Sequence, residues 1–144
     1  MDYSSEILKK FLNLYWVRPE TAFWRTLDVL QMKSVEFKKP ILDIGCGDGS
    51  FSFTNFGGSV DYSFDVYRTM KNTSGFFEGV DIHNQNKLIK PKIIKKVEQQ
   101  IDVGLDWKKN LLTKASQLNT YKKLIHHDSN KKLPFKDETF ETIF

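Results

Sequence analysis

The stretch ILDIGCGDGS, residues 41–50, says more about fold and function than any other part of the sequence. Its first four residues predict a short buried strand, and three glycines follow at alternate positions, Gly45, Gly47 and Gly49. Glycine adopts positive φ angles and lets a ligand approach the backbone, and open α/β sheets bind ligands beyond the carboxyl ends of their strands. The stretch therefore predicts a strand, a ligand-binding turn and a helix. A tight turn that holds no ligand is the alternative.

The glycine spacing and the acid Asp43 restrict the kind of ligand. A dinucleotide site prefers the spacing G-x-G-x-x-G, but Ser50 stands where the last glycine of that pattern belongs. Asp43 lies at the end of the predicted strand, where a carboxylate repels phosphate and tolerates an amine or a sulfonium group. The stretch therefore favours a cationic ligand over a dinucleotide.

A repeating order of strands and helices follows further along the chain. Apolar patterns predict strands at 101–106, 123–126 and 139–144, and a helix whose apolar stripe covers 111–118. Strand–helix–strand alternation implies right-handed crossovers and a parallel sheet. We therefore predict an α/β fold.

Two helical patterns precede the glycine stretch. The first ends near Tyr15, and the second begins at Pro19, a residue that suits the first turn of a helix because its missing N–H leaves no bond unmade there. We therefore divide the chain into N-terminal helices at 1–39 and a sheet domain at 40–144.

An irregular segment at residues 55–100 interrupts the regular pattern. It contains many turn-forming residues but also many aromatic ones, which a polar linker would not carry. We predict that it is an insertion packed onto the sheet domain, with a short helix at 91–99.

Two parts of the sequence resemble class I S-adenosylmethionine-dependent methyltransferases. The segment LDIGCGDG at 42–49 resembles the first motif of that superfamily. Residues 128–144 resemble a second block, typical of the type 11 subgroup, in which an acid, a polar spacer, Leu-Pro-Phe and an acidic turn lead into the fourth strand. The resemblance covers residues 40–54 and 101–144. It implies a Rossmann-like, mostly parallel sheet with strand order 3-2-1-4, and S-adenosylmethionine as cofactor.

The resemblance also bears on the extent of the fold. The full fold of the family has seven strands, and this chain ends at Phe144, inside the fourth. We therefore expect a truncated methyltransferase domain, in which the cofactor half is nearly complete and the remaining strands, with most of the acceptor half, are missing. The catalytic residues and the acceptor, which we expect to be a small molecule, cannot be identified from the sequence.

The family pattern assigns cofactor-binding roles to ten residues. In the glycine stretch these are Asp43, Gly45, Cys46, Gly47 and Gly49. The remaining five follow the second and third strands of the predicted sheet: Leu105, Asp106, Trp107, Asp128 and Ser129.

An acid after the second strand binds both ribose hydroxyls in this family, and a carboxylate suits that task because it accepts two hydrogen bonds at once. Asp65, Asp81 and Asp106 compete for the role. We choose Asp106, because a helix, a strand and the Leu-Pro-Phe block follow it in the required order. A helix cap or a plain surface acid is the alternative for this residue.

The adenine contacts follow from the same resemblance. Asp128 matches the acid that accepts the exocyclic amine, and the backbone N–H of Ser129 could reach a ring nitrogen. Leu105 and Trp107 flank the ribose acid and could pack on the adenine face, whereas ordinary core packing is the alternative for Trp107.

Other chemically active side chains carry weaker signals. His126 and His127 are neighbours on a strand and point to opposite faces, and no spacing of His, Cys and carboxylates indicates a metal site. Cys46 is better explained as a small residue in a tight turn than as a nucleophile. Trp24 and Arg25 precede the first strand and could cover the methionine end of the cofactor.

Composition limits the remaining function classes. The 144 residues carry a net charge of +4 and one cysteine, which excludes an intramolecular disulfide framework. No apolar run approaches the roughly 18 residues of a membrane span, and a signal-peptide core is absent from the N-terminus. We therefore expect a cytoplasmic protein with no membrane partner. Nucleic acid is not an expected partner either, since the densest lysine cluster, at 87–96, lacks interleaved aromatics.

Two further interpretations and one partner stay open. The chain could be a non-catalytic nucleotide-binding or interaction module, or an NAD-dependent oxidoreductase, although the latter lacks its usual glycine spacing. The outer edge of the fourth strand could pair with a second copy and form a homodimer.

Overall fold

The computed structural model describes residues 3–15, 18–61 and 90–144. In these residues a four-stranded sheet has the order β5-β4-β1-β6, and all three strand pairs are parallel. Numbered along the chain within this sheet, the order is 3-2-1-4, so the predicted α/β, Rossmann-like sheet is confirmed. Its strands have the following bounds: β1 Ile41–Ile44, β4 Ile101–Asp106, β5 Tyr121–His126 and β6 Thr142–Ile143.

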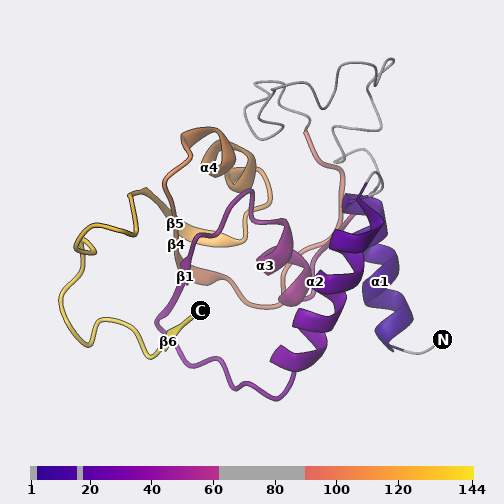
Figure 1. Ribbon diagram of the computed structural model, residues 1–144, viewed down its shortest axis with the longest axis horizontal. Coiled ribbons are helices and arrows are strands. Elements are labelled where there is room, and N and C mark those ends of the chain that lie inside the picture. The colour runs from indigo at the N-terminus through magenta and orange to yellow at the C-terminus, as the bar shows by residue number, and fades with distance from the viewer. Residues whose placement is uncertain (1–2, 16–17, 62–89) are drawn as a thin grey trace.

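The helices cover the sheet on one side (Figure 1). In chain order they are α1 Tyr3–Leu14, α2 Pro19–Met32, α3 Ser50–Asn55 and α4 Lys109–Ser116. Pro19 occupies the first turn of α2 as predicted. α1 packs against α2 and α3, and α4 packs against β4 and β5. Within the described part of the chain, no helix is long and apolar enough to cross a membrane.

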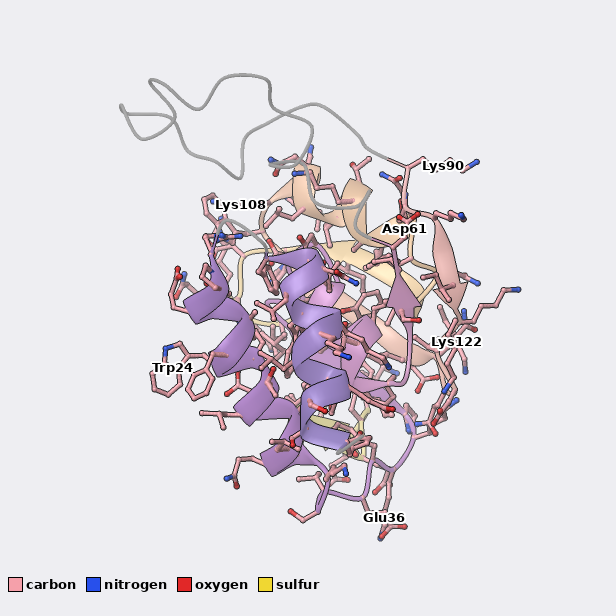
Figure 2. All side chains as sticks on the ribbon, turned by 90° about the vertical axis from the view of Figure 1, so that its right-hand side faces the viewer. Trp24, Glu36, Asp61, Lys90, Lys108 and Lys122 are labelled. Atoms are coloured by element: carbon pink, nitrogen blue, oxygen red, sulfur yellow. The ribbon has the colours of Figure 1, made fainter. Side chains whose placement is uncertain are left out.

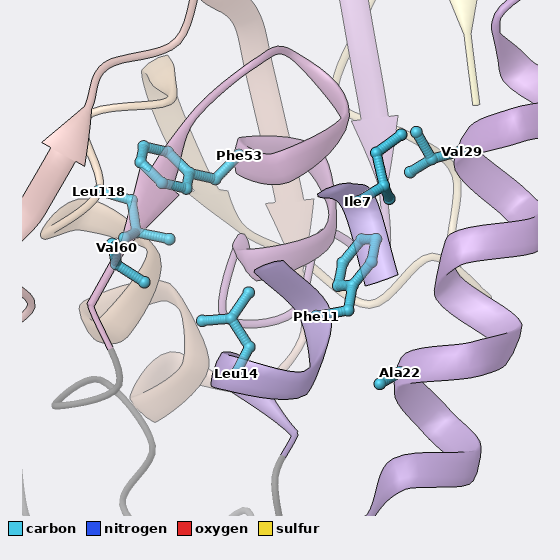
Figure 3. Packing of buried hydrophobic residues seen from close by; sticks show 8 residues of the cluster. All are labelled: Ile7, Phe11, Leu14, Ala22, Val29, Phe53, Val60 and Leu118. Atoms are coloured by element: carbon cyan, nitrogen blue, oxygen red, sulfur yellow. The ribbon is translucent and has the colours of Figure 1, made fainter. Parts of the chain in front are cut away.

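The N-terminal helices share a hydrophobic core with the sheet domain. Ile7, Phe11 and Leu14 on α1 pack against Val29 on α2 and Phe53 on α3 (Figure 3). The same cluster includes Val60 and Leu118, which lie well beyond residue 40. The segments 1–39 and 40–144 are therefore joined by packing as well as by the chain.

The two faces of the sheet have different covers. On the helical side, Ile41 and Ile101 pack with Leu112 and Ala115 of α4. On the other side Leu42, Val103 and Leu105 are covered by apolar side chains of the loop that follows β5, which are Leu133, Phe135 and Phe140. The Leu-Pro-Phe block thus contributes to the core as well as leading into β6.

The described ends of the 55–100 segment form a small second sheet. β2 (Ser59–Val60) pairs antiparallel with β3 (Ile93–Lys95), and Val60 is buried against α1. The predicted helix at 91–99 is therefore wrong. Ile93 and Ile94 are β-branched and favour a strand, and pairing with β2, more than thirty residues away, decides their conformation.

β6 forms one edge of the four-stranded sheet. Beyond its last residue, Phe144 continues the pairing with β1, because its N–H donates to the Leu42 carbonyl at 3.1 Å and its carbonyl accepts from the Ile44 N–H at 2.9 Å. Ile143 is 57 % exposed on this edge. Pairing of two copies through β6 remains a prediction.

Candidate functional site

The glycine turn after β1 has the backbone geometry that its sequence predicts. Gly45, Gly47 and Gly49 have φ angles of 75°, 57° and 76°, a region that other residues enter only with strain. A side chain at Gly45 or Gly47 would meet no atom within 4 Å. The first two glycines therefore present bare backbone to open space.

A cavity of about 470 Å³ opens above this turn. Four of the residues predicted to bind a cofactor line it: Asp43, Gly45, Cys46 and Gly47. Most of its remaining lining comes from the N-terminal helices and the segment joining them, from α3 and from α4: Tyr15, Arg18, Thr21, Arg25, Phe51, Ser52, Leu111 and Lys114. We call this the first cavity.

Asp43 is one of two acids that line the first cavity, the other being Asp48 in the glycine turn. Its side chain is 5 % exposed, and its Oδ2 accepts hydrogen bonds from the hydroxyls of Ser52 and of Tyr121, the latter at 2.7 Å. Burial raises the pKa of Asp43, while the two hydroxyls act in the opposite direction. The carboxylate is therefore held in one orientation by hydroxyls that sequence reasoning had not connected with it.

Three cationic side chains also line the first cavity: Arg18, Arg25 and Lys114. The Arg18 guanidinium lies 5.5 Å from the centre of the Tyr15 ring, and that of Arg25 lies 5.1 Å from the centre of the Phe51 ring. A ligand with a cationic group near Asp43 and an anionic group near these three cations would fit this distribution of charge.

The sequence predicts that Trp24 and Arg25, both on α2, cover the methionine end of a cofactor. That contact stays a prediction, and the structure brings one of the two residues to the first cavity. Arg25 lines the first cavity. Trp24 is 63 % exposed and extends outward from α2, away from the rest of the molecule (Figure 2). Successive residues of a helix point about 100° apart, so Arg25 faces the cavity while Trp24, one position earlier, points outward.

Cys46 lies inside the turn with its side chain almost fully buried. Burial and the nearby carboxylates of Asp43 and Asp106 raise its pKa strongly. A thiol that holds its proton is a poor nucleophile. This environment agrees with the interpretation of Cys46 as a small residue in a tight turn.

Asp106, at the end of β4, joins the glycine turn to the neighbouring strand. Its Oδ2 accepts from the Gly47 N–H at 3.0 Å, and its Oδ1 accepts from the Lys108 N–H at 2.7 Å, just before α4. Only 6 % of the residue is exposed. α4 begins after Lys108 with no side-chain cap, and Asp106 is too deeply buried to be a plain surface acid. Contact with a ribose remains a prediction.

A second cavity, of about 660 Å³, lies beyond the carboxyl ends of β4 and β5. It contains the three predicted adenine contacts Trp107, Asp128 and Ser129. Trp107 is 63 % exposed, so its ring is available to a planar ligand. The rest of the lining comes from His126 at the end of β5 and from the loop that follows it, which includes His127.

Two polar groups of the second cavity, the Asp128 carboxylate and the His127 ring, differ in their hydrogen bonding. Asp128 Oδ1 accepts from the backbone and side-chain N–H groups of Asn130, and the backbone bond holds the pKa of Asp128 below its ordinary value. The Nε2 atom of His127 is buried and has no hydrogen-bond partner among the described residues. A buried ring nitrogen of this kind suits a hydrogen bond to a ligand.

Three of the ten predicted cofactor-binding residues, Gly49, Leu105 and Asp106, lie in neither cavity lining. Leu105 is 1 % exposed and packs with Leu42 and Val103 in the core, so Trp107 is the flanking residue left to face a ligand. A Cβ on Gly49 would lie 3.2 Å from Ala115 and 3.2 Å from the ring of Tyr121. The third glycine of the motif therefore makes room for packing inside the protein.

The competing ribose acids Asp65 and Asp81 lie outside the described residues. Within those residues, no group of three or more His, Cys, Asp or Glu side chains could hold a metal ion. Comparison of the chain with protein-family models, with curated proteins and with solved structures found no match.

Proposed function

We propose that this chain binds S-adenosylmethionine across the two cavities and acts as the cofactor-binding part of a methyltransferase for a small-molecule acceptor. The observation that carries the proposal is the place of Asp106. It hydrogen-bonds Gly47, which lines the first cavity, and it precedes Trp107, which lines the second. A ligand that spans both cavities would pass Asp106 at its middle, where a nucleoside carries its ribose.

The first cavity suits the amino-acid end of such a ligand. Asp43 offers a carboxylate to the ammonium and sulfonium groups, and Arg18, Arg25 and Lys114 offer cations to the carboxylate. Opposite charges favour each other strongly when burial excludes water. The bare backbone at Gly45 and Gly47 leaves space for close contact.

The second cavity suits the adenine end. The exposed ring of Trp107 can stack on a base, since base–aromatic stacking contributes about 1–3 kcal/mol. Asp128 uses one oxygen to hold Asn130, which leaves Oδ2 for the exocyclic amine. The buried Nε2 of His127 provides a further polar contact.

When bound, S-adenosylmethionine supplies a methyl group that its sulfonium already activates. The residues of this chain then have two tasks: to fix the cofactor in one orientation, and to keep water from the sulfonium side of the first cavity. Correct placement of two reactants is itself a large part of catalysis.

Calorimetric titration with S-adenosylmethionine, S-adenosylhomocysteine and NAD tests the proposal. We expect both adenosyl compounds to bind and NAD to bind much more weakly. Asp106→Ala should reduce the affinity at least tenfold, because one hydrogen bond to a charged group contributes about 1.5–3 kcal/mol. Asp137→Ala, which removes an exposed acid from the loop before β6, is the matched control and should leave the affinity unchanged.

Absence of binding by the wild-type chain to either adenosyl compound would overturn the proposal. Preferential binding of NAD would favour the oxidoreductase instead. Unchanged affinity in Asp106→Ala would assign the ribose to another acid, provided that urea denaturation shows the variant to be folded.

A further inference from the structure

Two hydroxyls from separate elements hold the same oxygen of Asp43. Ser52 lies on α3 and Tyr121 begins β5, yet both donate to Oδ2. No donor in the described residues contacts Oδ1, and Asp43 lines the first cavity. One oxygen is thus fixed by the protein, and the other is left for a ligand.

Tyr121 reaches Asp43 across a neighbouring strand. In the sheet, β4 lies between β5 and β1, so the tyrosine ring must pass over β4 before its hydroxyl meets Asp43. It passes at Gly104, where a Cβ would lie only 2.7 Å from the ring carbon Cδ1. Any other residue at this position would push the ring away from its place.

The third glycine of the motif borders the same ring. A Cβ on Gly49 would lie 3.2 Å from Cε2 of Tyr121, which is tighter than ordinary van der Waals contact. Gly49 and Gly104 together form a slot for the ring, which we call the tyrosine slot. The two glycines come from segments more than fifty residues apart, and both contact one side chain.

We propose that Tyr121 is a positioning residue, which fixes the carboxylate of Asp43 so that Oδ1 meets the cationic group of the ligand in the first cavity. Gly49 and Gly104 serve this arrangement by admitting the ring. The inference rests on the proposed function and adds to it the residue that orients the acid.

Electrostatics gives the tyrosine hydroxyl a definite effect. Burial raises the pKa of Asp43, and a hydrogen bond donated to the charged form opposes that change. Loss of the Tyr121 hydroxyl would leave Ser52 alone to oppose burial. Among the described residues, the other ionisable groups near Asp43 come from the strand ends, the turn, the N-terminal helices and α4: Asp106, Cys46, Asp48, Tyr15, Arg18, Arg25 and Lys114.

The test uses Tyr121→Phe, which keeps the ring in its slot and removes only the hydroxyl. Two probes are titrated: S-adenosylhomocysteine, which carries an ammonium group, and 5′-methylthioadenosine, which has the same nucleoside without the amino acid. At pH 7 we expect the variant to bind the first probe about tenfold more weakly and the second within twofold of wild type. Tyr3→Phe, at a partly exposed tyrosine on α1, is the matched control and should change neither affinity.

A pH series and a double variant separate positioning from a general loss of structure. As pH falls, the affinity for S-adenosylhomocysteine should decline at a higher pH in Tyr121→Phe than in wild type, because its Asp43 takes up a proton more readily. In an Asp43→Asn background, Tyr121→Phe should have no further effect.

Equal loss of both probes in Tyr121→Phe, or an unshifted pH profile, would overturn the inference while leaving the proposed function standing. Failure of the wild-type chain to bind either probe would overturn the proposed function, and this inference with it.

Discussion

The two cavities lie at the same edge of the sheet but are held in different ways. In the first, Asp43 is 5 % exposed and bonded to hydroxyls that belong to the protein core. In the second, Trp107 is 63 % exposed, and Asp128 bonds within its own loop to Asn130. Changes in the first cavity should therefore affect stability and binding together, whereas changes in the second should affect binding alone.

The largest effect on this comparison should come from Gly104→Ala. The added methyl group would meet the Tyr121 ring at 2.7 Å, and overpacking of this kind costs about 1–3 kcal/mol. We expect the free energy of unfolding, measured in urea, to fall by about 2–3 kcal/mol. Ser129→Ala in the second cavity is the control and should stay within about 0.5 kcal/mol of wild type. Equal effects of the two variants would mean that the cavities do not differ in this way.

A second test changes a residue of the second cavity, where we expect an effect on binding and little effect on stability. Trp107→Ala should weaken the binding of adenosine by about 1–3 kcal/mol, which is the contribution of base–aromatic stacking. Its ring is mostly exposed, so the free energy of unfolding should change by less than about 0.5 kcal/mol. Calorimetric titration measures the affinity for adenosine, and urea denaturation measures the free energy of unfolding. A marked loss of stability would show that Trp107 packs in the core, as the alternative held.

The two carboxylates should also respond to pH with opposite signs. Burial raises the pKa of Asp43 from its ordinary 3.8, so any stability linked to its proton is fully present below that value and is lost as pH rises through the folded-state pKa. Relative to Asp43→Asn, the wild type should therefore lose stability over this interval. The loss amounts to about 1.4 kcal/mol for each pH unit that separates the folded-state pKa from the unfolded one.

The pKa of Asp128 is lowered, chiefly by the Asn130 N–H. Its contribution to stability is present above the ordinary pKa and is lost as pH falls through the lowered one. Urea denaturation of wild type, Asp43→Asn and Asp128→Asn measures the difference in stability between wild type and each variant. A range of roughly pH 3–8 covers the titration of both carboxyl groups. If the stability difference between wild type and variant changed in the same direction with pH for both residues, the contrast between Asp43 and Asp128 would be contradicted.

The smallest effect concerns two neighbours on α2. Arg25 lines the first cavity but is half exposed and pairs with Asp28 at 3.1 Å. Exposed charges contribute little, so Arg25→Ala should weaken the binding of S-adenosylhomocysteine by less than about 1 kcal/mol, and less in high salt. Trp24→Ala should leave the affinity unchanged. A larger effect of Trp24→Ala would place that side chain over the ligand.

Local sequence patterns were sufficient for much of this fold. The strand at 41–44, its glycine turn and the strand at 101–106 were predicted because apolar runs and glycine spacing act within a few residues. The strand order followed from the resemblance to the methyltransferase family, together with the general preference for parallel, right-handed connections. Four of the residues predicted to bind the cofactor line the first cavity, and their contact with a cofactor stays a prediction: Asp43, Gly45, Cys46 and Gly47.

Interactions between distant segments could not be predicted in the same way. Tyr121 meets Asp43 across 78 positions of the chain, and no local pattern marks a tyrosine that crosses a neighbouring strand. The isolated Gly104 inside a strand was the available signal, because glycine there often marks close approach of another group. The strand at Ile93–Lys95 was missed for a related reason, since its partner β2 lies on the far side of a long segment.

The pairing of β2 with β3 also has a consequence for engineering. Val60 is in register with Ile93, and the Asp61 N–H donates to the Lys92 carbonyl at 3.1 Å. The two ends of the intervening segment are therefore held side by side by backbone hydrogen bonds. The entropy of closing a loop depends only weakly on its length, and replacing about thirty residues by about six lowers the cost of closure by about 1.4 kcal/mol. The β2–β3 pair is therefore a suitable site at which to replace the segment between the two strands by one of different length, without changing the strands that form the two cavities.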